Sequence, residues 1–185
     1  MFIGRSLPRR REMYLLEWAQ FAGIVNPTES RSLARRAAAH RYAADATLAR
    51  AVVLRETLYR IFTSAVEGRR PRSADLEILS GELRLAKARE RLIHARGAFS
   101  WAWEDSAAAL DRVLWPVSLS AADVLTSGDL PQLRQCGGDK CGWLFLDTSR
   151  NRSRHWCDMK DCGNRAKVRR FRKRQQRSHT HVRSA

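Results

Sequence analysis

Four cysteines in the last third of the chain constrain its fold more than any other feature of the sequence. They form two pairs with the same spacing, Cys136-x4-Cys141 and Cys157-x4-Cys162, with fifteen residues between the pairs. Two close cysteine pairs separated by about the length of a hairpin are typical of a site in which four thiolates hold one Zn²⁺ ion. Four sulfur ligands leave no open position for a water molecule, so the ion would be structural. The spacing predicts one structural zinc ion held by these four cysteines.

Two disulfides, or four unrelated reduced thiols, are the alternatives to a metal site. The first sixteen residues contain neither the apolar core nor the cleavage site of a secretory signal, and no apolar run is long enough to span a membrane. We therefore expect a cytoplasmic protein, in which thiols stay reduced. His155 is an alternative ligand beside Cys157, but four cysteines already complete the site.

Positive charge gathers in the same segment as the cysteines. The 185 residues include 35 Lys and Arg against 19 Asp and Glu, a net charge of +16. Residues 150–177 alone hold 12 cations and two aspartates, or +10 in 28 residues. This imbalance indicates an anionic partner, nucleic acid or a membrane surface. We favour nucleic acid, because the basic segment carries too few apolar side chains to form a membrane-binding face.

Apolar residues at helical spacing predict that the N-terminal part of the chain is mainly α-helical. Leu15, Trp18 and Ala22 would share the buried face of a first helix. Ser30 is expected to cap a long Ala-rich helix, and Ser73 is expected to cap the helix that follows it.

Large and small side chains alternate over residues 91–104 on both sides of Gly97, which predicts a β-hairpin with this glycine in or near the turn. Phe99, Trp101 and Trp103 would share one face of its second strand. They are the candidate lining of a small-molecule pocket, although core packing between the hairpin and the helices explains the same pattern. The sequence does not identify a small-molecule effector.

Two short helices are expected after the hairpin. The first would end at Trp115, because Pro116 follows it. The second would begin after Ser120, which has Asp123 three residues further on, and would end near Gly128.

Within the cysteine segment, residues 143–147 alternate as a strand does, and residues 153–156 are expected to return antiparallel to them. A basic helix would then start at Cys162. Val168 and Phe171 are expected to pack back onto the hairpin, so that the basic side chains project toward a partner.

The candidate nucleic-acid contacts lie in this helix and just before the second cysteine pair. Asn164 can read an adenine edge, whereas the cations would mainly hold phosphates. The full set is Arg152, Arg154, Asn164, Arg165, Lys167, Arg169, Arg170, Arg172 and Lys173.

These features together predict a mainly α fold, with a helical N-terminal domain that includes a small β-hairpin and a C-terminal four-cysteine zinc finger made of a knuckle, a β-hairpin and a basic helix. The predicted domains are residues 1–130 and 131–177, followed by a disordered tail over 178–185. The chain contains no P-loop, no GxGxxG, HExxH or GxSxG motif, and no nucleophile–base arrangement, so we do not expect an enzyme.

The second cysteine pair also carries a family resemblance. The stretch Cys157-Asp-Met-Lys-Asp-Cys162-Gly-Asn-Arg-Ala-Lys-Val-Arg-Arg170 resembles the signature of the CGNR zinc fingers, named for the four residues that begin at Cys162. Residues 110–123 and 141–157 look like the rest of that bacterial family. The resemblance is specific from about residue 110 to 172.

The N-terminal region is similar, more loosely, to the ABATE domain that accompanies this finger and is described as a stress-induced transcription regulator. One departure is that the Asp-Phe-Val-Asn-like segment that usually precedes the first helix is not seen here. The resemblance implies transcriptional regulation and carries over no effector.

We therefore expect a zinc-dependent nucleic-acid-binding protein, specifically a bacterial DNA-binding transcription regulator that acts in the cytoplasm and lies on the nucleoid when bound. RNA is the alternative target, and a homodimer would provide paired half-sites. The alternative hypothesis is a zinc-stapled module for protein interaction or small-molecule sensing that does not bind DNA directly.

Overall fold

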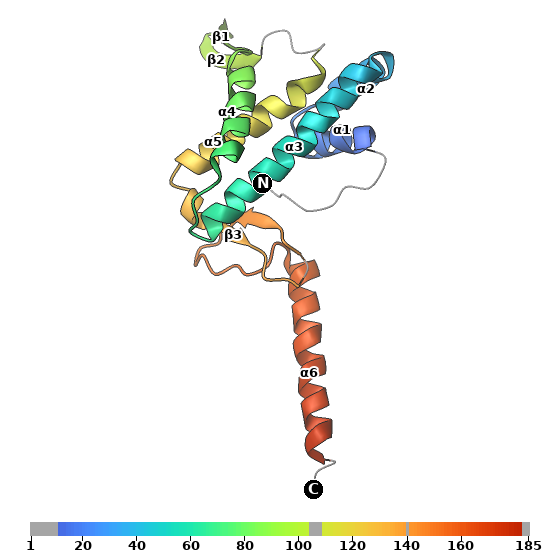
Figure 1. Ribbon diagram of the computed structural model, residues 1–185, viewed down its shortest axis with the longest axis vertical. Coiled ribbons are helices and arrows are strands. Elements are labelled where there is room, and N and C mark those ends of the chain that lie inside the picture. Colours follow the sequence, from blue (N-terminus) through green and yellow to red (C-terminus); the bar gives the residue numbers. More distant parts are fainter. Residues whose placement is uncertain (1–10, 104–108, 140, 183–185) are drawn as a thin grey trace. The chain divides into compact units, whose positions relative to one another are not determined.

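The computed structural model describes residues 11–103, 109–139 and 141–182, and side chains over 15–175 of these (Figure 1). The chain divides into two compact units between Leu130 and Pro131. The fold is mainly helical with a small β-hairpin, as the sequence predicts. In the described part of the chain, we find no helix with the length and apolar character that crossing a membrane requires.

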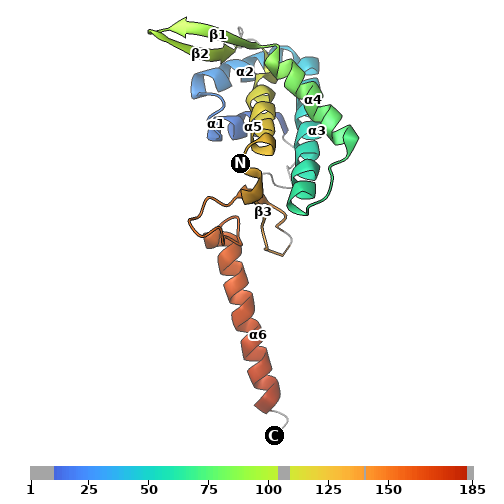
Figure 2. The same cartoon turned by 90° about the vertical axis from the view of Figure 1, so that its left-hand side faces the viewer.

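The N-terminal unit is a group of helices with one hairpin. Its elements are α1 (Arg11–Phe21), α2 (Pro27–Ala39), α3 (Arg41–Val66), α4 (Ser73–Lys87), β1 (Glu90–Ala95), β2 (Ala98–Trp103), the 3₁₀ turn η2 (Leu110–Val113) and α5 (Leu114–Thr126). Helix α4 packs against α3 and α5, and α1 packs against α2 and α3 (Figure 2). Leu58 and Phe62 of α3 and Trp115 of α5 are among the fully buried side chains of this core.

The first helix buries a different face from the one predicted. Ala19 is fully buried, whereas Trp18 is 42% exposed and Ala22 is also exposed, so the predicted face is wrong. Gly23, with φ +71°, ends the helix in a left-handed turn, and Val25 beyond that turn is buried. The small side chain of Ala19 lets the neighbouring helices approach closely.

Asn26, and not Ser30, caps the helix that follows. The Asn26 side-chain oxygen accepts hydrogen bonds from the backbone N–H groups of Thr28 and Glu29, both at 2.9 Å. The Glu29 carboxylate accepts the Asn26 N–H at 2.8 Å, which completes a capping box. The expected single long helix is interrupted at His40, which separates α2 from α3.

Residues 110–126 form one 3₁₀ turn and one continuous α-helix where two helices were predicted. Pro116 lies in the first turn of α5. Backbone N–H groups in the first turn have no partner within the helix, so a proline there costs no hydrogen bond. Ser120 therefore lies inside α5 and caps nothing. The other helix, α4, begins at Ser73 itself, with Arg72 in the capping position.

The predicted hairpin is confirmed. Strands β1 and β2 pair antiparallel, and Arg96 and Gly97 form the turn between them with φ +54° and +77°. Positive φ at both turn residues is the geometry that two-residue hairpin loops favour.

The C-terminal unit is small and ends in a long helix. Its elements are the 3₁₀ turn η3 (Leu130–Gln132), β3 (Leu133–Gln135), β4 (Leu144–Leu146), the π-helical turn η4 (Met159–Gly163) and α6 (Asn164–Val182). Strand β4 was predicted, but its partner is β3 and not residues 153–156. Helix α6 includes residues 178–182, for which the sequence predicts disorder, while 183–185 lie outside the described residues.

The side chain of Asp147 gives a physical reason for the different strand pairing. Asp147 is fully buried, and its carboxylate accepts hydrogen bonds from the backbone N–H groups of Ser149 at 3.0 Å and Arg154 at 2.9 Å. This folds the segment after β4 into a loop. The antiparallel position beside β4 is taken by β3, where Leu133 pairs with Leu146.

Candidate metal centre

The four cysteine sulfurs come together at one point of the C-terminal unit. The Sγ atoms of Cys136, Cys141, Cys157 and Cys162 all lie within 4.8 Å of one another. Cys157 Sγ lies 3.6 Å from Cys141 Sγ and 3.7 Å from Cys162 Sγ. A disulfide requires about 2.05 Å, and all four cysteines are free. A tetrahedron with metal–sulfur bonds of about 2.3 Å has edges of about 3.8 Å, so the spacing fits a four-coordinate metal.

Secondary structure places each ligand. Cys136 directly follows β3, and its N–H donates to the carbonyl of Trp143 at 2.7 Å, which closes the first knuckle. Cys162 lies in the π-helical turn η4, whose first N–H groups are capped by Asp158. Cys136 therefore lies in a knuckle, and Cys162 lies in the turn that leads into α6.

Gly138 lies against the sulfurs, where a side chain would make tight contacts. A Cβ atom added there would lie 3.2 Å from Cys162 Sγ and 3.4 Å from Cys136 Sγ. Gly142, just after Cys141, has φ +68°, a conformation that favours glycine. Within the first knuckle the close contacts therefore favour glycine at Gly138, whereas a Cβ at Gly137 would make an ordinary contact with Trp156 at 3.4 Å.

The thiols are not electrostatically equivalent. Burial raises the pKa of Cys136, but hydrogen bonds from the N–H groups of Cys157 at 3.3 Å and Gly138 at 3.4 Å, together with those from the Cys157 and Cys141 thiols, outweigh this effect and lower the pKa overall. Burial and the neighbouring sulfurs raise the pKa of Cys157. Four thiolates this close repel one another, so the full set of ligands needs a cation to balance its charge.

A small core surrounds the sulfurs. Phe145 of β4 is buried against Cys136 and Cys162, and Trp156 packs against the same cluster. Trp156 therefore belongs to the core of the finger, whereas Trp143 is 39% exposed.

The comparisons with known families agree with this geometry. The model of the ABATE family, described as "Putative stress-induced transcription regulator", matches residues 14–128, and that of the CGNR zinc finger matches residues 132–175. The chain belongs to the ABATE family. Its C-terminal unit is a CGNR zinc finger, and the two matches follow in the predicted order. These are regulatory and zinc-finger families, not enzyme families. No curated protein sequence matches the chain.

Three predicted nucleic-acid contacts are engaged inside the CGNR finger. Arg165 donates to Asp161 at 2.6 Å and to the Cys162 sulfur at 3.7 Å, and these two groups raise the pKa of its guanidinium. Arg169 forms an ion pair with Asp139 at 2.6 Å. Both arginines connect α6 to the knuckles.

Arg154 is the third of these residues, and it lies within the loop between the knuckles. Its guanidinium donates to the carbonyls of Trp156 and Cys157 and lies 4.8 Å from the centre of the Phe145 ring. Its backbone N–H donates to Asp147. Arg154 therefore supports the second cysteine pair from outside the metal shell.

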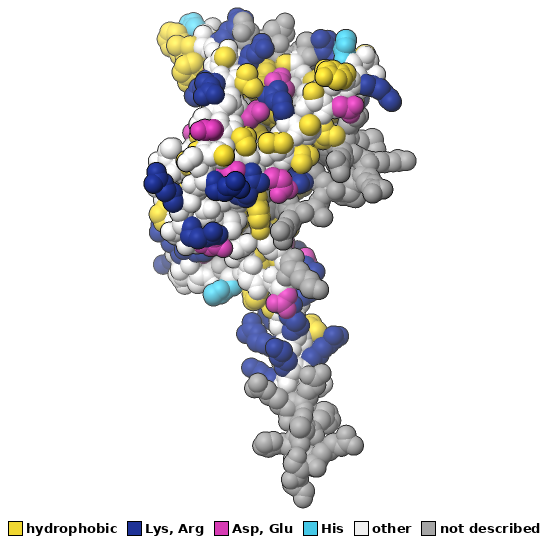
Figure 3. All heavy atoms as spheres, viewed as in Figure 1, with side chains coloured by type: hydrophobic (Ala, Val, Ile, Leu, Met, Phe, Trp, Pro, Cys, Tyr) yellow, Lys and Arg dark blue, Asp and Glu magenta, His cyan; other side chains and the backbone are white. Residues whose placement is uncertain are grey.

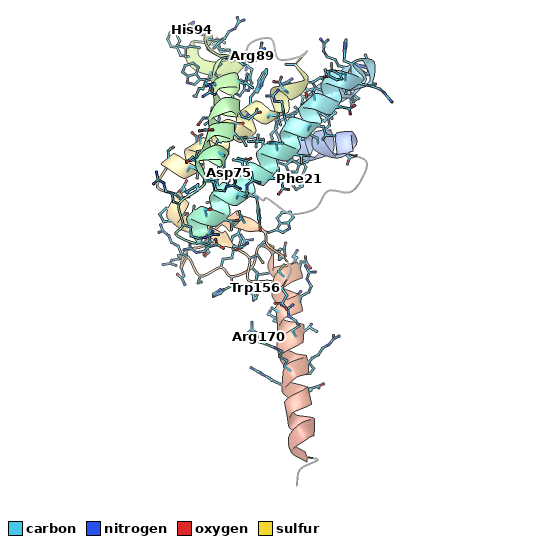
Figure 4. The ribbon with its side chains drawn as sticks, in the orientation of Figure 1. Phe21, Asp75, Arg89, His94, Trp156 and Arg170 are labelled. Carbon is cyan, nitrogen blue, oxygen red and sulfur yellow. The ribbon has the colours of Figure 1, made fainter. Side chains whose placement is uncertain are left out.

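The remaining predicted cations lie in solvent. Figure 3 shows Lys and Arg side chains gathered along the described part of α6. Four of them have exposed side chains that form no hydrogen bond or ion pair with any described residue: Lys167, Arg170, Arg172 and Lys173. Arg152 is exposed with φ +46°, and the Asn164 side chain donates to the Lys160 carbonyl at 3.0 Å. Figure 4 shows Trp156 at the finger end of α6 and Arg170 further along this helix.

Val168 and Phe171 do not pack onto the finger as predicted. They are 47% and 61% exposed, and among the side chains of α6 that the structure describes, 164–175, it is Ala166 that is buried. Ala166 lies one turn beyond Cys162, so the helix leaves the metal site with this face inward. Val168 and Phe171 consequently face solvent.

The three aromatic residues proposed to line a pocket are not brought around one. Phe99 and Trp101 are 73% and 68% exposed, so the expectation of a pocket, and the alternative of core packing, are both wrong for these two side chains. Trp103 packs against Trp115, with ring centres 5.4 Å apart. A two-stranded hairpin has no second layer to cover the outer part of this face. A hollow of about 330 Å³ lies elsewhere in the same unit, beside α2, α3 and η2.

Sequence reasoning missed the polar residues that organise the finger. No structural role was predicted for Asp147 or Asp139. Asp147 accepts three hydrogen bonds, and Asp139 forms an ion pair with Arg169 of α6. The available signal for Asp147 was an aspartate two residues before a serine, directly after an apolar strand. That pattern is typical of an Asx turn.

Proposed function

We propose that this protein is a DNA-binding transcription regulator whose CGNR finger is held together by one structural Zn²⁺ ion. The four thiolates would bind the ion, which supplies charge balance and a rigid junction between the two knuckles. The N-terminal ABATE unit would carry the regulatory function, and the family description supports this assignment. Such a regulator acts in the cytoplasm, on the nucleoid when bound.

The observation that carries the proposal is the position of the exposed cations relative to the metal ligands. Helix α6 begins two residues after Cys162, without a linker. Lys167, Arg170, Arg172 and Lys173 follow within three turns and have no acidic partner among the described residues. A zinc-clasped finger would thus present these charges as one rigid unit, which favours an ordered polyanion over a purely structural role.

Helix dimensions and charge fit duplex DNA. The major groove is about 12 Å wide and admits one α-helix, whose cations then reach the phosphates on both sides. Phosphate contacts give affinity and orientation but little sequence information. Arg165 and Arg169 would hold the helix at its angle to the finger, and the free cations would hold the DNA.

The test is a fluorescence-anisotropy titration of a labelled duplex at several salt concentrations. If the four free cations and Arg152 neutralise five phosphates, log K should fall with log salt at a slope of about −4 to −5, and each of Lys167→Ala and Arg172→Ala should reduce the steepness of that slope by about 1. Arg35→Ala, which removes an exposed cation of α2, is the matched control and should leave the slope unchanged. A flat salt dependence would contradict the proposal. Competition by structured RNA that exceeds that of duplex DNA would reassign the target to RNA.

A second candidate function, self-association through the hairpin, is favoured by the exposure of Phe99 and Trp101. Leu92 pairs with Trp101 on the same face of the hairpin and is 59% exposed. A second copy could cover this apolar face and would pair two fingers on one duplex. Light scattering tests this idea, because Trp101→Ser should convert a dimer into a monomer. A monomeric wild-type protein would exclude it.

A further inference from the structure

The exposed face of α6 carries a stripe of uncharged side chains. The stripe consists of Asn164, Val168, Phe171 and Gln175, spaced four, three and four residues apart, so the side chains lie on one helix face. All four are exposed, and the two apolar ones are 47% and 61% exposed. The opposite face of the helix carries buried Ala166, so the stripe is turned away from the finger.

Cations flank the stripe on both sides. At 100° per residue, Lys167 and Arg174 lie along one edge of the stripe and Arg172 lies along the other, together with Arg165, which is paired with Asp161. The described turns of α6 hold no acidic side chain. An apolar and amide stripe between two rows of positive charge matches the layout of a DNA groove, where base edges lie between two phosphate backbones.

The stripe differs from a protein-binding face in its surroundings. Pairing with a second copy of α6 through Val168 and Phe171 would bring the flanking cation rows of both helices close together. These like charges would repel one another. Two apolar side chains are also few for a stable helix–helix contact. Charge complementarity therefore favours a polyanion in which apolar and hydrogen-bonding groups lie between two rows of negative charge.

We propose that this stripe reads base edges in the major groove and selects sites that contain A·T pairs; the inference rests on the DNA-binding function proposed above. Val168 and Phe171 would contact the 5-methyl groups of thymine, the apolar feature of the groove. Gln175 carries an amide, which can pair with the N6 and N7 atoms of adenine. Asn164 would do so with its oxygen and with the N–H that its bond to the Lys160 carbonyl leaves over. The stripe spans eleven residue steps, about 16 Å, or about five base pairs.

The experiment compares three labelled duplexes of about 20 base pairs with the zinc-loaded full chain. The first contains A·T pairs in mixed order, the second carries uracil in place of every thymine, and the third contains only G·C pairs. Uracil keeps the base pairing and lacks only the methyl group. Wild-type protein should bind the thymine duplex about fourfold more tightly than the uracil duplex for each methyl group that it buries. It should bind the G·C duplex most weakly.

Two variants separate the recognition of bases from the contacts with phosphates. Phe171→Ala should abolish most of the thymine preference and keep the salt slope, because it removes an apolar contact and no charge. Lys167→Ala, a neighbouring exposed residue, should weaken binding to all three duplexes equally and keep the thymine preference. Both side chains are exposed, so the metal content of both variants should equal that of the wild type, which verifies that the finger is intact.

The outcomes also distinguish a failure of base recognition by the stripe from a failure of DNA binding. Equal wild-type affinity for thymine and uracil duplexes would overturn the stripe while leaving DNA binding in place. No binding to any duplex at low salt would overturn both. Loss of a wild-type dimer in Phe171→Ala would show that the stripe contacts protein and would also overturn the inference.

Discussion

Arg169 of the basic helix α6 pairs with Asp139 in the first cysteine knuckle, with 2.6 Å between Nη1 of the arginine and Oδ2 of the aspartate. Asp139 lies between Cys136 and Cys141, whereas Arg169 follows Cys162 by two turns. The pair therefore joins the two halves of the finger outside the metal ligands. It attaches α6 to the finger at a second point and so helps to fix the direction of the helix.

A double-mutant cycle on this pair should show a measurable coupling. Asp139→Ala, Arg169→Ala and the double variant should give a coupling free energy of about 0.5 kcal/mol, since partly exposed pairs contribute about 0.2–1 kcal/mol. The measurement is thermal unfolding of the metal-loaded protein at low salt. At 1 M salt the coupling should decrease, because screening weakens exposed pairs. Additive effects at low salt would show that the pair does not orient the helix.

Loss of a cysteine should unfold the finger and spare the N-terminal helices. Cys136→Ser and Cys162→Ser should each fail to retain metal, because binding and folding are one event in small zinc sites. The residues before Pro131 form their own compact unit, so most of the helical circular dichroism should remain. Metal content by mass spectrometry and the cooperative unfolding of the remaining helices are the readouts. Ser153→Ala is the control and should retain one metal ion per chain.

Gly138→Ala should weaken metal binding without removing a ligand. The added Cβ would press on Cys162 Sγ at 3.2 Å and on the Cys141 Cβ at 3.3 Å. Changes next to metal ligands typically cost 10- to 100-fold in affinity, and we expect a loss of about tenfold in chelator competition. Gly128→Ala is the matched control, because a Cβ there meets nothing within 4 Å. Equal affinities of the two variants would show that the first knuckle tolerates a side chain.

Asp75 should make the stability of the N-terminal unit depend on pH. Its buried carboxylate accepts hydrogen bonds from Arg60 at 3.0 and 2.6 Å, which lower its pKa. A lowered pKa means that the stabilisation is present above the unfolded pKa of about 3.9 and is lost as the pH falls through the folded pKa. Asp75→Asn should therefore cost about 1–3 kcal/mol at pH 7, and the cost should shrink near pH 3.

Urea unfolding followed by circular dichroism at the two pH values measures this difference. Asp45→Asn, which changes an exposed aspartate of α3, should match the wild type at both pH values. A penalty for Asp75→Asn that is the same at pH 7 and pH 3 would mean that Asp75 contributes packing and not charge.

The parts of the structure that could be predicted from sequence are those determined by local spacing. The cysteine pairs and the hairpin around Gly97 depend on residues close together in the chain, and the sulfur cluster and the β1–β2 pairing agree with those predictions. The partner of β4 could not be predicted, because it depends on the buried carboxylate of Asp147. Whether an aspartate is buried is decided by the packing of distant segments.

The orientation of α6 shows the same limit. Spacing places Val168 and Phe171 on one face, but it does not say which face of the helix meets the finger. The direction in which the chain leaves Cys162 decides this, and that direction buries Ala166. A small residue carries little signal in a sequence pattern, so the error was in the choice of face and not in the helix itself.

The most direct test of the account is a titration of labelled duplex DNA with the same protein before and after metal removal. The zinc-loaded chain should bind at low salt, chelation should reduce the affinity at least tenfold, and added Zn²⁺ should restore it, since only the metal-clasped finger presents α6 rigidly. Affinity that is unchanged by chelation, with loss of the metal verified by mass spectrometry, would contradict it.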